Sequence, residues 1–307
     1  MQFAVESWSP EYGAPMESGP QDAGASVDLQ VEVPVVDWAP VTPSADAPPP
    51  HDVLFIDGVR RIDARVWLDA GSDSVLGICA SYAAGSVRCN ATAALEDLRV
   101  ERALFTRAGA EPIVTRNATY PLRAVATDDL DDLIRGVQQR MGALEIAIAA
   151  DAAPSDLVVV DGPLSGRQNV PQAIGMIKTH RVRYLPEAGN QVVAALASGQ
   201  RTPLFLTQTN WSRFSWYVRL PGGNGHPWAG VVRCEASADR TLDEVRQVAD
   251  MSARQLVRFA SEAHKDPRAP QNLYPIAGLE RQLRHRLGDP TLLYRSLCAA
   301  AGSSRAA

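Results

Sequence analysis

Hydrophobic and polar residues are arranged in two distinct ways along this chain. Short runs of consecutive apolar residues, such as LVVV at 157–160, are typical of strands that are buried on both faces. Alternation of apolar and polar residues, as in VDLQVEV at 27–33, indicates a strand with one buried face. These patterns predict strands at 27–33, 52–58, 61–70, 74–85, 156–160, 203–207, 214–220 and 229–236, and another after a helix or loop within 169–186.

Longer segments have the spacing of helices. Residues 127–151 place apolar side chains on one face, begin with four acids that suit the positive end of a helix dipole, and have Thr127 or an adjacent aspartate as a cap. A second helix is expected over about 241–264, and a last one after NLYPIAG at 272–278. Residues 91–126 fit a helix or a strand equally well.

The order of these elements predicts the fold class. Three antiparallel strands are followed by a helix, a strand, a helical segment and more strands, which is the order of the α/β ribonuclease H-like fold, a mixed sheet flanked by helices. We expect an N-terminal β-containing arm with a proline-rich linker at 1–50, the main domain at 51–300, and a flexible tail at 301–307.

Net charge, apolar runs and cysteine spacing limit the partners and compartments that we expect for the protein. The formal net charge of -5 argues against a surface coated with nucleic-acid contacts but leaves room for a local basic channel. The chain contains no long apolar run and begins without the basic and apolar regions of a signal peptide, so we expect no membrane association and a cytoplasmic location. The four scattered cysteines have no zinc-site spacing and are expected to be reduced.

Two predicted strands end in an Asp-Gly pair, and an acidic helix lies between them. In a ribonuclease H-like order, Asp57 and Asp161 would lie side by side, and Glu145 could reach them from the helix. Three converging carboxylates repel one another unless a cation neutralises them, and hard oxygen ligands suit Mn²⁺ or Mg²⁺. Two such ions about 4 Å apart could activate water for phosphodiester hydrolysis. We therefore predict Asp57, Glu145 and Asp161 as catalytic metal ligands.

Other interpretations of these acids stay open. An Asp-Gly pair is also a common turn signal, and a lone helical glutamate is usually solvated. Glu96 and Glu101 compete with Glu145 for the third position, and Asp63 could lie near Asp57 across a hairpin. The hypothesis fails if Asp57 and Asp161 face apart, or if a salt bridge consumes either of them.

Basic residues follow both Asp-Gly pairs. Lys178, with His180 and Arg181 close behind it, could hold the scissile phosphate or the DNA backbone, and we predict Lys178 as a catalytic residue. Arg60 and Arg61 could add to the same DNA-binding surface. The alternative for these residues is an ordinary basic loop, a structural histidine and solvated arginines.

Several short motifs occur together in a recognisable order. FIDGVRR, ALEIAI before LVVVDGPLSG, GMIKTH and QNLYPIAGLERQL together resemble the NurA nuclease family over about residues 51–290. The resemblance implies a ribonuclease H-like core and Mn²⁺-dependent cleavage of DNA, with 5′-to-3′ end resection in double-strand break repair. It also implies a homodimer that works with a HerA-like hexameric translocase ATPase. Asp57, Glu145 and Asp161 would then be metal ligands and Lys178 a phosphate contact.

The last motif departs from the family pattern. Tyr274 and Pro275 are present, and Tyr274 is predicted to be catalytic, with a packing role before the helix as the alternative. Gln282 stands where family members often have a histidine, and His285 could replace it if the helix is shifted by about a turn.

Three functions are compared on this basis. A metal-dependent DNA nuclease is the leading hypothesis. A catalytically weak or silent DNA clamp or ATPase partner is supported by Gln282 but not by the three retained carboxylates. A phosphotransferase of the actin-like superfold ranks below both, because the chain has no Gly-rich phosphate loop.

Overall fold

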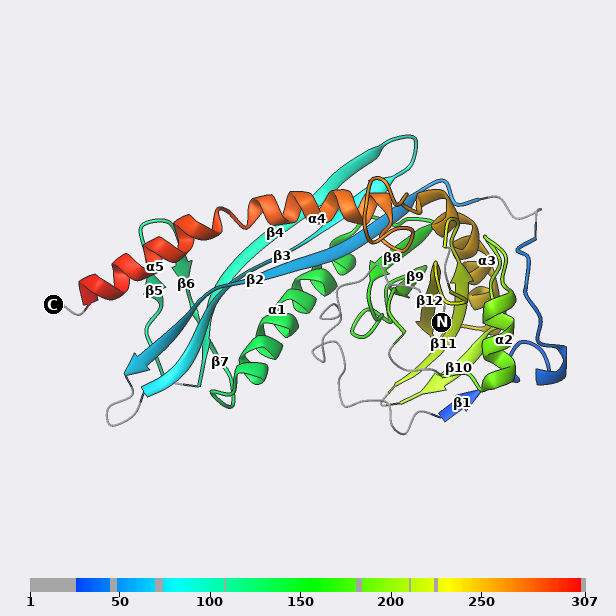
Figure 1. The fold of residues 1–307 in the computed structure, drawn as a ribbon, viewed down its shortest axis with the longest axis horizontal. Helices are drawn as coiled ribbons and strands as arrows, with labels where there is room; N and C mark the ends of the chain where they lie inside the picture. Colours follow the sequence, from blue (N-terminus) through cyan, green and yellow to red (C-terminus); the bar gives the residue numbers. More distant parts are fainter. Residues whose placement is uncertain are drawn as a thin grey trace, which may run out of the picture. The chain divides into compact units, whose positions relative to one another are not determined.

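The computed structural model describes residues 26–44, 49–69, 74–107, 109–180, 184–209, 211–223 and 226–304. These residues form a mixed α/β structure in which helices flank a ten-stranded sheet of order β1-β10-β11-β12-β9-β8-β2-β3-β4-β7 (Figure 1). The strands of this sheet are β1 (Ser26–Asp28), β2 (Val53–Asp69), β3 (Ser74–Cys89), β4 (Ala93–Thr106), β7 (Leu122–Ala124), β8 (Leu157–Asp161), β9 (Ala173–Ile177), β10 (Phe205–Gln208), β11 (Ser212–Arg219) and β12 (Val231–Ser237). The mixed sheet flanked by helices is as predicted, and the finer ribonuclease H-like assignment stays a prediction.

Parallel strands lie at the centre of the sheet. β8 pairs in parallel with β2 on one side and with β9 on the other. From β9 outward, β12, β11, β10 and β1 follow as antiparallel neighbours. β8 consists of apolar residues buried on both faces, up to the partly exposed Asp161. The adjacency of the first long strand and the strand at 157–161 is therefore as expected.

The strand β2 differs from the prediction. We expected a turn at Asp57-Gly58 and two separate strands, but β2 continues unbroken from Val53 to Asp69. Gly58 serves another purpose: a Cβ there would overlap Oε1 of Glu145 and lie 2.9 Å from Cγ of Met141. The glycine thus permits close approach of a helix rather than a turn.

The segment with an ambiguous sequence pattern forms a strand, and five α-helices accompany the strands in the described residues. Residues 93–106, which fit either helix or strand, form β4. Asp129 caps α1, since its side chain accepts the N–H of Asp131, and Thr127 in turn accepts the N–H of Asp129. The helices are α1 (Leu130–Asp151), α2 (Glu187–Ala195), α3 (Leu242–Phe259), α4 (Tyr274–Arg286) and α5 (Pro290–Ser304), with a 3-10 turn η1 (Val35–Asp37) and a small ribbon of β5 (Ile113–Val114) and β6 (Thr119–Tyr120).

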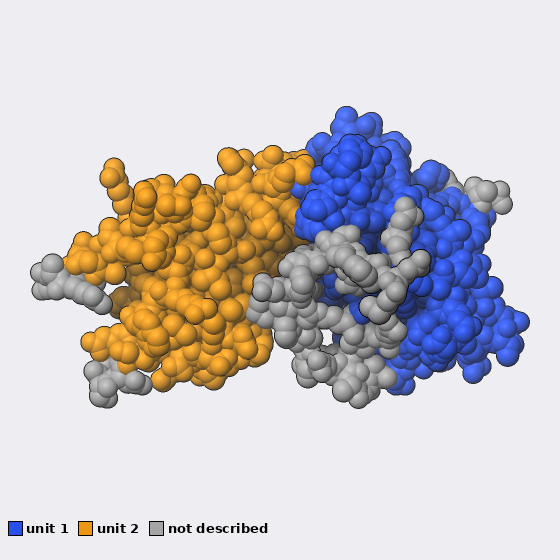
Figure 2. Space-filling model, in the orientation of Figure 1, with its two compact units in different colours: residues 1–56, 87–94, 152–277 blue, residues 57–86, 95–151, 278–307 orange. Residues whose placement is uncertain are grey.

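The chain divides into two compact units (Figure 2). Unit 1 comprises residues 1–56, 87–94 and 152–277. In its core, Phe205 stacks on Tyr217, with ring centroids 5.8 Å apart, and Phe55 meets Phe259 edge to face at 4.9 Å. These aromatic pairs join α3 and the strands β2, β10 and β11, and each buried ring contributes about 2 kcal/mol by removal from water.

Unit 2 comprises residues 57–86, 95–151 and 278–307. Its core includes Cys79, Leu104, Tyr120 and Leu297. Successive residues of a strand point to opposite faces, and β2 shows this clearly. Arg60 donates from Nε to Gln138 on α1 at 2.6 Å, whereas Arg61 donates to the carbonyls that follow α4. Helices α1 and α4 thus lie on opposite faces of β2 (Figure 1).

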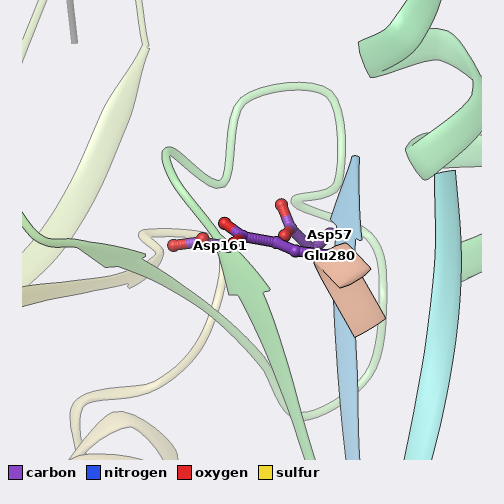
Figure 3. A group of neighbouring side chains, drawn as sticks. All are labelled: Asp57, Asp161 and Glu280. Carbon is purple, nitrogen blue, oxygen red and sulfur yellow. The ribbon is translucent and has the colours of Figure 1, made fainter. Parts of the chain in front are cut away.

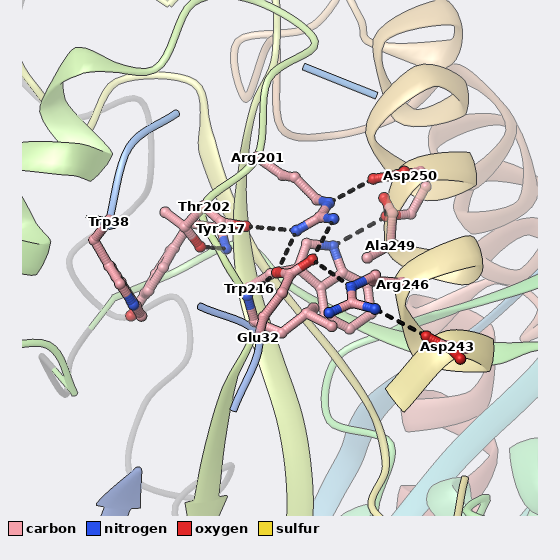
Figure 4. A network of polar contacts seen from close by, with 12 residues as sticks. Glu32, Trp38, Arg201, Thr202, Trp216, Tyr217, Asp243, Arg246, Ala249 and Asp250 are labelled. Carbon is pink, nitrogen blue, oxygen red and sulfur yellow. Dashed lines mark hydrogen bonds and ion pairs between the residues drawn. The ribbon is translucent and has the colours of Figure 1, made fainter. Parts of the chain in front are cut away.

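A buried ionic network holds the segment around Glu32 to the rest of unit 1 (Figure 4). Both carboxylate oxygens of Glu32 lie 2.9 Å from the Arg201 guanidinium, whose Nε also pairs with Asp250 at 2.6 Å. Arg246 adds a second cation at 3.2 Å from Glu32. Burial alone would raise the pKa of Glu32, but the Arg201 hydrogen bond and charge, with Leu204 and Arg246, lower it overall.

Cysteine placement agrees with reduced thiols. All four cysteines are free; Cys79, Cys89 and Cys234 are buried, and Cys298 is exposed on α5. Among the described residues, every helix is too short or too polar to cross a bilayer. α5 continues through Ser304, so the first residues of the predicted tail are helical.

Candidate metal centre

Asp57 and Asp161 lie on neighbouring parallel strands. The β2–β8 register pairs Ile56 with Val160, so the next residue of each strand is one of the two aspartates. Gly162 follows the end of β8 with φ +105, a conformation that favours glycine, so the second Asp-Gly pair does end its strand. The predicted meeting of the two aspartates is therefore confirmed.

Glu280 is the third member of the acidic group. Asp57, Asp161 and Glu280 each offer a carboxylate oxygen, and these oxygens all lie within 4.8 Å of one another (Figure 3). Asp57 and Glu280 are buried, at 6% and 8% exposure, and Asp161 is partly buried. Two strands and one helix thus bring three carboxylates together from distant parts of the sequence. We call Asp57, Asp161 and Glu280 the acidic triad.

Sequence reasoning missed Glu280, although a signal was present. Helix α4 buries Ile276, Leu279 and Leu283, and Glu280 falls within this apolar face, four residues after Ile276 and three before Leu283. An acid inside the apolar stripe of a helix is costly to bury without a partner, which marks it as a candidate ligand. Gln282 and His285, the two positions of α4 considered from the sequence, are both exposed.

Glu145, the predicted third ligand, lies on the other face of β2. It is buried on α1, and its Oε1 lies where a Cβ of Gly58 would be. Positions 57 and 58 point to opposite faces of the strand, so Glu145 and the Asp57 side chain lie on different faces of β2. The acidic triad projects from the face of β2 that meets α4. Among the described residues, the structure therefore brings Asp57 and Asp161 to Glu280 rather than to Glu145.

The competing acids have other contacts. Asp63 is buried and accepts hydrogen bonds from Ser81 and Tyr120. Glu101 accepts from the Tyr82 hydroxyl at 2.8 Å, and Glu96 is exposed on β4. None of these three belongs to the acidic triad found among the described residues.

Lys178 contacts the acidic triad directly. Its Nζ lies 2.5 Å from Oδ2 of Asp161 and 3.0 Å from Oδ1 of Asn272. The Asn272 amide is oriented by its other end, which donates to Asp266 at 2.7 Å. Both Lys178 and Asn272 are buried. An ammonium has three N–H donors. Among the described residues, Asp161 and Asn272 accept two of them, which leaves the third for a ligand.

The Lys178–Asp161 ion pair must be compared with the condition stated from the sequence, that no salt bridge consumes Asp57 or Asp161. A salt bridge that consumed Asp161 would argue against a metal centre, and this one engages Oδ2. A carboxylate has two oxygens and can accept from an ammonium and bind a metal at once. Lys178 is therefore both the predicted phosphate contact and an internal competitor for Asp161.

Tyr274 and His180 lie in structural contacts. Tyr274 is exposed at the start of α4 and donates to Glu262 at 3.1 Å. The His180 ring packs on Tyr217 and Trp228 and donates from Nε2 to the Val231 carbonyl at 2.8 Å. Burial lowers the pKa of His180 to about 4, so its imidazole is neutral at neutral pH.

The predicted DNA-binding arginines lie in different surroundings. Arg60 contacts Gln138, and Arg61 is bound to Asp63 at 2.8 Å and to the carbonyls of Leu287 and Gly288. Arg181 lies outside the described residues. A DNA-binding role for these residues stays a prediction.

The donor set fits a divalent cation. Three buried or half-buried carboxylates this close repel one another unless positive charge lies among them. Carboxylate oxygens are the ligands that Mn²⁺ and Mg²⁺ prefer, and thiol or imidazole ligands are absent from this group. The acidic triad is therefore suited to a hard cation rather than to zinc.

Comparison with known proteins found similarity to a solved structure. No family model and no curated protein matches this chain. Among solved structures, the chain is similar to the NurA nuclease from Sulfolobus solfataricus, with a TM-score of 0.47 and 13% sequence identity over 82% of this chain and 86% of that one.

Proposed function

We propose that this chain hydrolyses phosphodiester bonds in DNA with Mn²⁺ or Mg²⁺. The observation that supports it is the acidic triad, with carboxylate oxygens within 4.8 Å of one another beside the Lys178 ammonium. Asp57, Asp161 and Glu280 would hold the metal, which when bound supplies an activated water and stabilises the leaving oxygen.

The chain's own residues have separate tasks in this proposal. Lys178 directs its remaining donor to a phosphate oxygen and offsets the negative charge that develops there. Asn272 holds the ammonium in place, since its amide is fixed by Asp266. Glu145 lies against the backbone next to Asp57 and would support the position of β2 rather than bind metal.

The substrate and partners follow from the sequence motifs. Their resemblance to the NurA nucleases favours DNA ends as the substrate, and 5′-to-3′ resection in double-strand break repair as the process. By the same resemblance, we propose a homodimer that acts with a HerA-like hexameric ATPase. A cytoplasmic location is consistent with these roles.

Cleavage of labelled linear DNA tests the proposal. The wild type is compared in Mn²⁺, Mg²⁺ and EDTA with Asp57→Asn, Asp161→Asn and Glu280→Gln, each of which keeps side-chain size. Glu111→Gln, an exposed position, is the matched control. We expect metal-dependent degradation that each triad variant abolishes and the control retains.

The opposite result favours another function. Equal traces from wild type and triad variants, with or without the cognate translocase, would overturn the nuclease proposal. DNA binding that persists in that case would indicate a silent clamp or ATPase partner, for which the Lys178–Asp161 ion pair would serve as a permanent substitute for metal.

A further inference from the structure

The carbonyls at the C-terminal end of α4 are held by two arginines. From β2, Arg61 donates through Nη1 to Gly288 at 2.8 Å and through Nη2 to Leu287 at 3.3 Å. From β4, Arg102 donates through Nη2 to the same Leu287 carbonyl at 2.9 Å. Positive charges at the C-terminal end of a helix also interact favourably with the partial negative charge of the helix dipole there. We call Arg61 and Arg102 the helix clamp.

Arg61 is itself fixed by a buried carboxylate. Its Nε donates to Oδ1 of Asp63 at 2.8 Å, and the Asp63 side chain is fully buried. Oδ2 of Asp63 accepts from Ser81 at 2.5 Å and from Tyr120 at 3.1 Å. Burial, with the nearby charge of Asp63, raises the pKa of Tyr120, so its hydroxyl stays a donor. The guanidinium is therefore locked to the core and is not a freely moving surface cation.

The clamp lies close to the acidic triad along both elements. Asp57 and Arg61 point to the same face of β2, four residues or about 13 Å apart. Glu280 and Leu287 are separated by seven residues, about 10 Å along a helix. The strand and the helix thus run side by side with contacts at two points, Asp57 with Glu280 and Arg61 with Leu287.

Two such contacts fix the rotation and the axial position of α4. A slip of one residue along a helix moves a side chain by about 1.5 Å and turns it by about 100°. Either change would carry the Glu280 carboxylate out of reach of Asp57. The clamp removes this freedom because it binds main-chain carbonyls, which cannot move independently of the helix.

We infer that Arg61 and Arg102 are positioning residues that set Glu280 in the acidic triad by clamping the end of α4. This inference rests on the proposed function, because Glu280 is taken there as a metal ligand. It gives Arg61 a different task from the DNA contact predicted from the sequence.

Mn²⁺ binding to the full chain, measured by calorimetry without DNA, tests the inference. Arg61→Ala, Arg61→Lys and Arg102→Ala are compared with Arg65→Ala, which removes the same charge from an exposed position on the same strand. We expect about a 10- to 100-fold weaker Mn²⁺ affinity for the clamp variants, the range found for groups that orient metal ligands, and no change for Arg65→Ala. Arg61→Lys should behave like Arg61→Ala, because an ammonium lacks the planar fork.

Two further measurements keep the outcomes distinct. Hydrogen exchange should show faster exchange within α4 in the clamp variants, while thermal unfolding shows that each remains folded. DNA affinity in EDTA should be unchanged by Arg61→Ala; a loss there, with normal Mn²⁺ affinity, would overturn the inference in favour of DNA contact. If Asp57→Asn also leaves Mn²⁺ binding intact, the proposed function fails; if Asp57→Asn abolishes binding and the clamp variants do not, only the inference fails.

Discussion

The Lys178 ammonium and the Asp161 carboxylate form a buried ion pair, with Nζ and Oδ2 2.5 Å apart. Lys178 has only 2% of its side chain exposed, so the pair is shielded from solvent and from salt. This one contact joins the acidic triad to the residue that we propose as its phosphate ligand. It also places a positive charge where a metal would compete for the same carboxylate.

Replacement of Lys178 should separate metal binding from catalysis. Lys178→Met keeps the side-chain length and removes the charge, so we expect a roughly 10²- to 10³-fold lower kcat for DNA cleavage. Mn²⁺ affinity should be unchanged or higher, since Asp161 is released from its competitor. Lys265→Met, at the exposed second lysine, is the control. Unaltered cleavage by Lys178→Met would show that the ammonium does not act on the phosphate.

The two candidate third ligands should differ in their effect on metal affinity. Glu280→Gln removes one charge from the acidic triad and should weaken Mn²⁺ binding by at least about tenfold, because an amide is a poorer ligand for a hard cation. Glu145→Gln lies on the opposite face of β2 and should change the affinity far less. Titration of Mn²⁺ by calorimetry checks both. The reverse order of effects would restore Glu145 as the ligand.

The position of these residues shows what the sequence could and could not predict. Apolar runs located β8 and the start of β2, and because parallel neighbours end at one edge, Asp57 and Asp161 were correctly brought together. Glu280 was not found, since its role depends on which face of α4 meets β2, and that contact is made by residues more than two hundred positions apart.

The turn predicted at Asp57-Gly58 was wrong, and the contacts of Arg61 were not foreseen, both for physical reasons. Asp57-Gly58 has the composition of a turn, but the glycine is required by the approach of α1, which local sequence does not reveal. Arg61, predicted from the sequence as a DNA contact, lies against Asp63 and the end of α4 in the structure, and these contacts also could not be found from local sequence. In both cases the surroundings of the residue depend on tertiary packing.

His180 should make the protein sensitive to mild acid. Burial, opposed by the Val231 hydrogen bond and reinforced by Arg233 and His226, lowers its pKa from 6.5 to about 4. Between pH 6.5 and pH 4, His180 is therefore protonated in the unfolded chain but neutral in the folded chain. The neutral buried imidazole costs no stability above pH 6.5, and the free energy of unfolding decreases as the pH falls from 6.5 toward 4. Linkage gives a loss of up to about 2 kcal/mol between pH 7.5 and pH 5.

Urea unfolding at pH 7.5 and pH 5 measures this effect. His180→Gln keeps a donor for the Val231 carbonyl and cannot titrate, so its stability should fall less over the same pH interval. If wild type and variant lose equal stability, the imidazole does not supply the pH dependence.

Glu32 should be essential for the attachment of the segment around it. Its side chain is 7% exposed and accepts from the buried Arg201, so Glu32→Gln removes one of the two carboxylates that pair with this guanidinium and leaves only Asp250. We expect a loss of about 2–3 kcal/mol in the free energy of unfolding, measured in urea at pH 7, because charge-assisted hydrogen bonds are weakened while Asp250 still compensates the charge. Because the pKa of Glu32 is lowered, this contribution is present above pH 4.5 and declines as pH falls through the folded value. Glu111→Gln, on the surface, should change stability by less than about 0.5 kcal/mol.

The placement of the four thiols has a practical consequence for spectroscopy. Burial raises the pKa of Cys79 to about 12 and also raises the pKa values of Cys89 and Cys234, so these sulfurs stay protonated and poorly nucleophilic. Cys298 alone among them is exposed. A maleimide fluorophore or spin probe added to the unaltered protein should therefore attach at one defined point on α5, without any engineered mutation.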